Sequence, residues 1–423
     1  MDSSEFRRVI TNGLGRAALW VRNNSWRPHE EAIKHVCLHN TAYDAQCEGS
    51  RAEYIYEIVR RTDSLDHFSE IAVTGLMASR EFWDTSHLFR LNRLFAQAGF
   101  ARSRDALYEK FEKGDAEERS IGAEEFIRLD GTNGVLFALG VAGGWFDRDA
   151  GYREDDYFLQ EAQRILGPEV ILSLRQAAQT NANIRRYLEE VERTMQRRSK
   201  QSRTDYRSFT YPQMRDMILS VHGEVTRTWL FFWGKHATED FIRMAASDLL
   251  NEQDDAILVA YLRIFSHRAF PLDNKRLIDL ARSPNKEVAA AARRSLRLLR
   301  SEAIRELAVE IIRGGDHTEG SIPLLIKNYR EGDHLLIESL LEAATNEEDF
   351  HWAARDSLDV FTANPQAPAL RSLLDIYDKC RCSICRHGGV KILADRRILP
   401  SLIHEECRFD SYEDTREIAR LAN

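Results

Sequence analysis

A chain of 423 residues is long enough for two or three ordinary domains or for one long array of repeats, and either arrangement can bury a sizeable core. With 43% hydrophobic and 30% charged residues, the composition excludes widespread disorder. The formal net charge of −8 argues against a surface covered with phosphate-binding lysines, so any nucleic-acid contact must come from a local groove. No apolar run reaches the roughly 18 residues of a membrane span and no secretory signal is present, so we expect a cytoplasmic protein without membrane contact.

The first 195 residues are predicted to form an N-terminal array of helices. Apolar residues recur there at three- and four-residue spacing, which is the pattern of amphipathic helices. The segments with this pattern are 13–24, 30–40, 52–62 and 87–99. Strand signals are scarce throughout the chain, so the sequence predicts an all-α fold.

Hydrogen-bonding side chains are concentrated in residues 39–59, which we interpret as one helix. On a helix, Asp44, Glu48 and Arg51 fall at positions i, i+4 and i+7 and share one side. Such a face is costly to bury unless its charges are paired. It is either a solvated helix surface with an internal Glu48/Arg51 ion pair, or a polar wall of a ligand groove that Tyr43 also lines.

The segment REFWDTSHLFRLNR, residues 80–93, places aromatic and charged side chains at the start of a predicted helix. We expect this helix to run from about residue 86 to 98, with Asp84, Thr85 or Ser86 as its N-cap and Gly99 following its end. Helical spacing puts Trp83, His87 and either Arg90 or Leu91 on one side. An aromatic ring beside cationic donors suits a nucleobase and its phosphate.

A basic run separates the N-terminal array from the rest of the chain. Six basic side chains accompany Asp205 there: Arg193, Arg197, Arg198, Lys200, Arg203 and Arg207. The run is either a solvated helix end or linker, or a basic strip that contacts phosphate. We assign residues 196–210 to this basic linker or helix end and residues 211–423 to a C-terminal part.

The C-terminal part is predicted to consist of helix pairs. Residues 277–312 form a helical hairpin around the turn Ser283-Pro284-Asn285, and similar units follow with a period of about 30 to 40 residues. Each unit would bury its apolar face by stacking on the next. The alanine-rich stretch of residues 283–299 resembles the second half of a HEAT repeat, a resemblance that covers about residues 240–423 and implies a HEAT-like α-solenoid with a concave groove.

Four of the six cysteines lie near the C-terminus. Cys380, Cys382 and Cys385 form a CxCxxC sequence, and Cys407 follows further along. They are either ligands of a structural zinc ion or unligated thiols between helices, and the missing second CxxC favours the thiols. No phosphate-binding loop and no Ser-His-Asp, kinase or HExxH sequence occurs, so we expect no cofactor.

The motif Phe82-Trp83-Asp84-Thr85 resembles a segment of the alkylpurine DNA glycosylases built from HEAT-like repeats, and the resemblance covers about residues 30–190. In that family this tryptophan, and an aspartate three or four positions further on, face the damaged nucleotide in a concave groove. Trp83 matches the tryptophan, whereas His87 occupies the position of the catalytic aspartate. Arg119 lies at the spacing of the family's phosphate-contacting arginine, and Tyr157 or Phe158 is a candidate for its second aromatic residue.

The resemblance implies a DNA glycosylase that cleaves the N-glycosidic bond of a bulky or cationic modified base in duplex DNA, for repair or for defence against phage with modified DNA. The candidate catalytic residues are then Asp84, His87, Asp44 and Glu48. The candidate DNA-contacting residues are Trp83, Tyr43, Arg51, Arg90, Arg119 and Phe158. The alternative is a non-catalytic HEAT-like adaptor that binds a protein partner along its concave face, which is the commoner use of such arrays.

Overall fold

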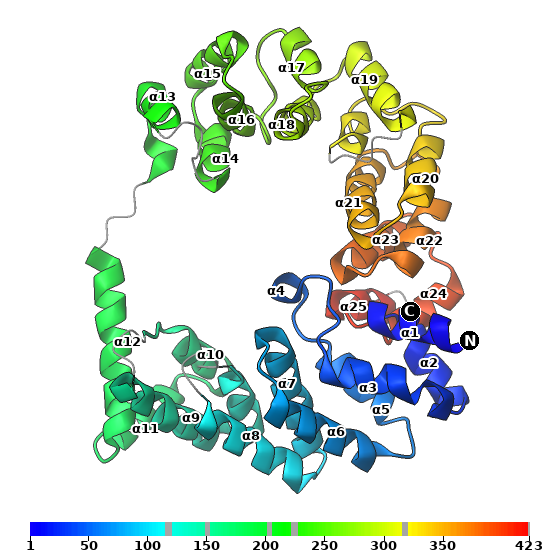
Figure 1. Cartoon of the computed structure of the whole chain (residues 1–423). Coiled ribbons are helices and arrows are strands. Elements are labelled where there is room, and N and C mark those ends of the chain that lie inside the picture. The colour runs from blue at the N-terminus through cyan, green and yellow to red at the C-terminus, as the bar shows by residue number, and fades with distance from the viewer. Residues whose placement is uncertain (115–120, 149–152, 201–204, 221–226, 315–319, 422–423) are drawn as a thin grey trace. The chain divides into compact units, whose positions relative to one another are not determined.

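The computed structural model describes residues 1–114, 121–148, 153–200, 205–220, 227–314 and 320–421 (Figure 1). Within these ranges the chain forms α-helices and short 3-10 helices, and no strand occurs in them. The predicted all-α fold class is therefore confirmed. None of the helices in these ranges combines the length and the apolar composition that crossing a membrane requires.

Internal contacts divide the chain into two units, which are described separately here. The first comprises residues 1–202, 381–384 and 400–423, and the second comprises residues 203–380 and 385–399. The division after Ser202 falls inside the segment 196–210. Residues 400–423 group with the N-terminal helices, whereas the sequence places them in the C-terminal array.

The first unit contains most of the N-terminal half of the chain. Its helices are α1 (Ser3–Asn12), α2 (Arg16–Asn23), η1 (Arg27–His29), α3 (Glu30–Leu38), α4 (Ala45–Glu48), α5 (Ala52–Val59), α6 (Leu65–Ala78), α7 (Phe82–Gln97), α8 (Ala101–Lys113), α9 (Ala123–Arg148), α10 (Tyr157–Leu166), α11 (Glu169–Ala177), α12 (Ala182–Lys200), α24 (Ser401–Cys407) and α25 (Glu413–Leu421). Local signals set the ends of several of them. The Asp2 carboxylate caps α1 by accepting the Glu5 N–H at 2.9 Å, and Gly13, with φ +80°, ends it.

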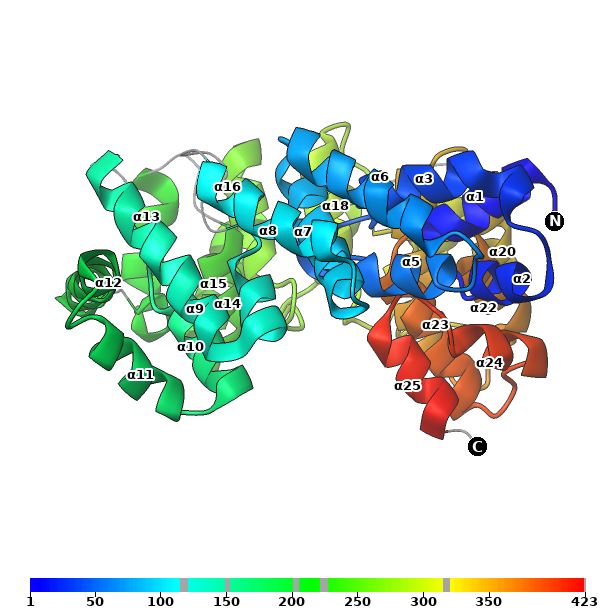
Figure 2. The same cartoon turned by 90° about the horizontal axis from the view of Figure 1, so that it is seen from below.

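Helix α6 is central to the part of the first unit that carries the candidate site. It packs against α3, α7 and α8, and Figure 2 shows α6, α7 and α8 as neighbours. Gly75 permits this close packing, because a Cβ atom there would lie 2.4 Å from a methyl group of Leu38 on α3. Phe68 on α6 and Leu88 and Phe95 on α7 are fully buried, which stabilises the packing of these helices.

The C-terminal segment returns to the N-terminal helices of the first unit. The Ser411 N–H donates to the Gly13 carbonyl at 2.8 Å, and Arg16 forms an ion pair with the buried Glu406 carboxylate at 2.8 Å. Gly15 lies against the backbone of Glu406 so closely that any side chain would collide with it. These contacts connect residues nearly 400 positions apart, which no local pattern could predict.

The second unit contains the predicted hairpin and the helices around it. They are η2 (Tyr206–Ser208), α13 (Tyr211–Ser220), α14 (Arg227–His236), α15 (Glu239–Asn251), α16 (Asp255–Ile264), α17 (Lys275–Leu280), α18 (Lys286–Leu296), α19 (Glu302–Arg313), η3 (Ile322–Leu325), α20 (His334–Ala343), α21 (Glu347–Ala363), α22 (Leu370–Lys379) and α23 (Ser383–Asp395). Asn285 caps α18 by accepting the Glu287 N–H at 3.0 Å, so the predicted turn lies between α17 and α18. Ala289 and Ala292 are buried on α18, which packs on α17.

Candidate functional site

Helix α7 begins earlier than its sequence predicted. Its first residue is Phe82 and its cap is Glu81, whose carboxylate accepts the Asp84 N–H at 2.6 Å. The predicted caps Asp84, Thr85 and Ser86 are therefore wrong, because the Glu81 side chain caps the helix before any of them. Gly99 has φ +101° and follows the end of the helix as expected. The consequence is that the Asp84 carboxylate is not used as a cap.

The Asp84 carboxylate instead binds the chain that follows α3. It accepts the Asn40 backbone N–H at 2.7 Å, and its second oxygen lies 2.7 Å from Nδ1 of His39. The Asp84 side chain is 22% exposed and the His39 side chain is 50% exposed. Two contacts thus fix the carboxylate while the imidazole keeps one face in solvent.

This pair lies at a pocket of about 730 Å³ between α3, α6 and α7. Its apolar wall is formed by Leu38, Ile71, Ala78 and Leu88. Charged or titratable side chains complete its lining: Lys34, His67, Glu70, Arg80 and Glu81, besides His39 and Asp84. The volume is within the range of small-molecule sites, and the mixture of an apolar wall with a few convergent polar groups is typical of them.

Two aromatic side chains are exposed in the first turn of α7. Phe82 is 51% exposed and Trp83 is 38% exposed, and their rings meet edge to face with centroids 4.9 Å apart. They directly precede Asp84 on the helix, but neither Phe82 nor Trp83 lines the pocket that Asp84 lines. An exposed pair of this kind offers stacking area to a flat ligand.

His87 is fully buried, which excludes the direct contact with a substrate that the sequence suggested. Its Nδ1 lies 3.1 Å from the Ser50 hydroxyl, and its Nε2 has no hydrogen-bond partner among the residues that the structure describes. Burial lowers the pKa of His87 to about 4, although the Asp84 charge opposes the shift. The ring is therefore neutral at ordinary pH and belongs to the interior of the first unit.

Residues 39–59 do not form one helix, so the predicted polar face is wrong. Gly49, with φ +74°, separates α4 from α5. The Glu48/Arg51 ion pair exists at 3.1 Å, but it is buried rather than solvated: the two side chains are 1% and 3% exposed. Burial raises the pKa of Glu48, but the Arg51 charge and the hydrogen bonds from Ser383 outweigh it, so the net shift is downward. Neither residue is accessible to a ligand.

Asp44 and Tyr43 lie apart from the pocket. Asp44 is exposed and caps α4, where its carboxylate accepts the Gln46 and Cys47 N–H groups at 3.0 and 3.2 Å. Tyr43 is half-buried in the preceding loop. Neither side chain lines the pocket beside Asp84. Asp44 therefore has a local structural role in this structure.

The described residues that were predicted to contact phosphate or to supply the second aromatic ring do not lie together at the pocket. Arg90 pairs with Glu53 at 2.6 Å, and Arg119 lies outside the described residues. Phe158 is buried on α10 and lines a separate cavity of about 140 Å³. The structure therefore brings neither Arg90 nor Phe158 to the Asp84 pocket.

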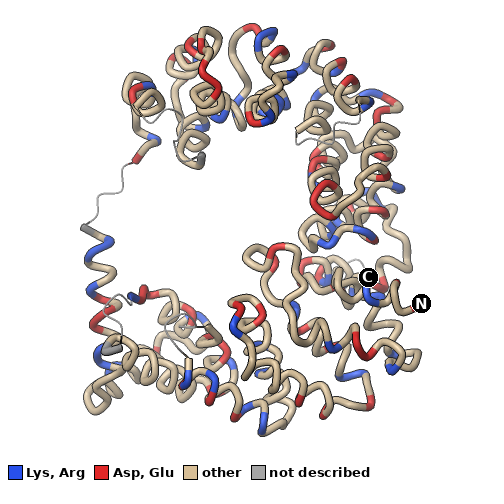
Figure 3. Tube along the Cα trace, in the orientation of Figure 1, with Lys and Arg blue, Asp and Glu red and all other residues tan. Residues whose placement is uncertain are grey.

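Acidic neighbours accompany the basic run at the end of α12. Arg193 binds Glu190 at 2.5 Å and Arg198 binds Asp155 at 3.1 Å. Basic and acidic positions are interspersed along α12 in Figure 3. Since much of the positive charge is matched within the first unit, this part of the run favours a solvated helix end over a phosphate-binding strip.

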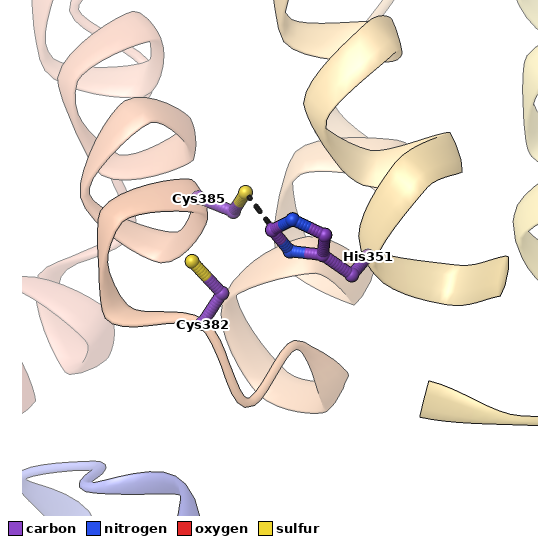
Figure 4. A group of neighbouring side chains, drawn as sticks. All are labelled: His351, Cys382 and Cys385. Atoms are coloured by element: carbon purple, nitrogen blue, oxygen red, sulfur yellow. Dashed lines mark hydrogen bonds between the residues drawn. The ribbon is translucent and has the colours of Figure 1, made fainter. Parts of the chain in front are cut away.

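The four C-terminal cysteines are buried. Cys382 and Cys385 belong to a group of possible metal ligands with His351, which the sequence did not suggest (Figure 4). Cys380 and Cys407, the other two predicted ligands, are not members of this group. His351 was missed because it lies on α21, more than 30 residues before the CxxC pair.

His39 was missed for a related reason. It follows directly after α3, and only the fold brings Asp84, 45 positions later, to its ring. No local pattern distinguishes it from the other histidines of the chain. The exit of a helix into a polar loop is a weak signal for such a residue, because functional side chains concentrate in loops.

No protein-family model, no curated protein and no solved structure matches this chain significantly. The residues of the site are therefore the whole basis for assigning a function.

Proposed function

We propose that the chain is a DNA glycosylase that hydrolyses the N-glycosidic bond of a bulky or cationic modified base. The observation that carries the proposal is the Asp84–His39 pair, fixed at 2.7 Å beside a pocket of about 730 Å³. The motif Phe82-Trp83-Asp84-Thr85, which resembles the alkylpurine glycosylases, contributes both the carboxylate and the adjoining aromatic rings. His39 replaces His87 as the titratable partner in this proposal.

The reaction needs a base for water and negative charge near the sugar. If Nδ1–H of His39 donates to Asp84, Nε2 keeps its lone pair and accepts a proton from water as the oxygen attacks C1′. The C1′–N bond breaks and its electrons leave with the base. In this proposal the Asp84 carboxylate stabilises the positive charge of the sugar, whose transition state resembles an oxocarbenium ion.

Binding is assigned to groups around this pair. Phe82 and Trp83 stack on the nucleotide, and the apolar wall of the pocket accommodates a bulky base substituent. Lys34 and Arg80 line the pocket as phosphate contacts, while Glu81 favours a cationic base. In this proposal the helices form a HEAT-like solenoid, and the enzyme acts in the cytoplasm in alkylation repair or against modified phage DNA.

The deciding experiment measures abasic sites in duplex DNA. The full chain is incubated with duplexes that carry alkylated or bulky modified bases, and abasic sites are detected by strand cleavage after alkali treatment. We expect product with the native chain and a loss of about 100-fold or more with Asp84→Asn. Asp44→Asn removes the same charge from a nearby exposed loop and should retain full activity. Absence of product from every modified duplex contradicts the proposal.

A protein-binding adaptor is the second candidate, because much of the positive charge is matched internally. Arg90 pairs with Glu53 and Arg198 pairs with Asp155, and the net charge of the chain is −8. The two functions differ in their response to salt. A glycosylase binds modified duplex DNA at low salt and loses affinity as salt rises, whereas an adaptor shows no DNA binding even at low salt.

A further inference from the structure

Two buried cysteines lie close to the imidazole of His351 on α21. Cys382 and Cys385 are three residues apart at the start of α23, and both thiols are almost fully buried. Sγ of Cys385 lies 3.6 Å from Nδ1 of His351 on α21. A ligand atom from each of the three residues lies within 4.8 Å of the other two, and Figure 4 shows the side chains converging.

These separations fit a tetrahedral transition-metal ion. Zinc binds thiolate sulfur at about 2.3 Å and imidazole nitrogen at about 2.0 Å, which places two tetrahedral ligand atoms about 3.5 to 3.8 Å apart. The distance of 3.6 Å between Sγ of Cys385 and Nδ1 of His351 already has this length. Since all three ligand atoms lie within 4.8 Å of one another, a small side-chain rotation is enough to bring the others to it. Two sulfurs and one imidazole are also the donor types that zinc prefers over magnesium or calcium.

The helices that carry Cys385 and His351 are held close together. Gly388 on α23 lies against Leu358 on α21, where an added Cβ would be 2.8 Å from a leucine methyl group. The buried Arg386 guanidinium, on α23, donates at 3.2 Å to the carbonyl of Cys380, which precedes the helix, and this bond holds the backbone that leads into the CxxC pair. A metal site here therefore needs little reorganisation of the protein.

We propose that Cys382, Cys385 and His351 bind a zinc ion, with the fourth position left for solvent or a small ligand. Each thiol loses its proton to solvent as its sulfur binds the ion, so binding releases protons. The ion would connect the start of α23 to α21. A redox-active thiol pair fits the structure less well, because reactive cysteines of that kind are partly exposed and these two are about 4% exposed.

The test is the metal content of the full chain, purified without chelators. We expect about one zinc ion per chain, and we expect added Co²⁺ to produce a thiolate charge-transfer absorption band. Cys385→Ser and His351→Gln should each lower the bound metal at least tenfold, with unchanged helical circular dichroism. Cys47→Ser is the matched control, because Cys47 is an exposed free thiol, and it should bind metal as the native chain does.

The variant His351→Cys keeps the proposal testable if the other variants fail to fold. It supplies a third thiolate in place of the imidazole and should retain zinc, since Cys-rich sites are common structural zinc sites. A native chain that holds no zinc and takes up neither zinc nor cobalt overturns the proposal. So does a Cys382–Cys385 disulfide in protein purified under air, because it would show that the pair is a redox couple.

Discussion

Two carboxylates of the first unit, Asp84 and Glu48, have similar partners and opposite surroundings. Each accepts backbone N–H hydrogen bonds and contacts a basic side chain, His39 for Asp84 and Arg51 for Glu48. The Asp84 side chain is 22% exposed at a pocket, whereas the Glu48 side chain is 1% exposed. Access, rather than the kind of hydrogen bond, distinguishes a group that can react from one that holds the fold together.

The Glu48 region connects distant parts of the first unit. Its carboxylate accepts the Ser383 N–H at 2.9 Å and the Ser383 hydroxyl at 2.5 Å. Arg51 donates to the Arg381 carbonyl at 3.0 Å. These bonds join the N-terminal helices to residues 381–384 of the first unit. A buried pair of this kind is expensive to break, because the remaining charge has no water to solvate it.

The largest stability loss is expected from Glu48→Ala. Removing this carboxylate leaves the buried Arg51 guanidinium without its counter-charge, which costs about 3 to 5 kcal/mol of unfolding free energy. Urea unfolding followed by circular dichroism measures the change. Glu31→Ala is the control: the Glu31 carboxylate is exposed and pairs with Lys34 at the surface, so its loss should be within about 0.5 kcal/mol. Equal losses of unfolding free energy in Glu48→Ala and Glu31→Ala would mean that the buried Glu48 carboxylate does not stabilise the fold more than an exposed one does.

The next largest effect is expected on the rate of abasic-site formation, when Asp84 or His39 is replaced. Asp84→Asn and His39→Gln should each reduce abasic-site formation by about 10² to 10⁴-fold, because each removes half of the arrangement that activates water. The double variant should lose little more than either single variant, since residues that act as a unit are strongly non-additive. Fully additive losses in single-turnover rates would mean that the two residues do not work together.

The acid stability of the first unit tests the burial of His87. The pKa is about 4 in the folded chain and 6.5 ordinarily, so between these values the unfolded chain binds the proton and the folded chain does not. The unfolding free energy therefore falls as the pH drops from about 6.5 to about 4, and His87 contributes about 3 kcal/mol to this fall. His87→Gln should reduce the loss measured by urea unfolding at the two pH limits. If the unfolding free energy of His87→Gln falls as much as that of the native chain, another group causes the pH dependence.

The sequence predicted the helices better than it predicted the site. Spacing of apolar residues gave the all-α class and the end of α7 at Gly99, because these depend on local geometry. The start of α7 was misplaced because Glu81 took the capping role from Asp84. The burial of His87 and the approach of His39 to Asp84 depend on how α3 and α6 pack against α7, and no pattern within one helix contains that information.

The smallest effect is expected from Asp44→Ala, which sharpens the contrast with Asp84. Asp44 is exposed and its carboxylate caps α4, a helix of four residues, so its removal should cost about 1 kcal/mol of unfolding free energy. Abasic-site formation should not change, because the residue does not line the pocket. Asp44→Ser, which restores an oxygen that accepts the same N–H groups, should recover most of the stability. If Asp44→Ala instead abolished activity at unchanged stability, the catalytic carboxylate would lie in this loop and Asp84 would be its structural partner.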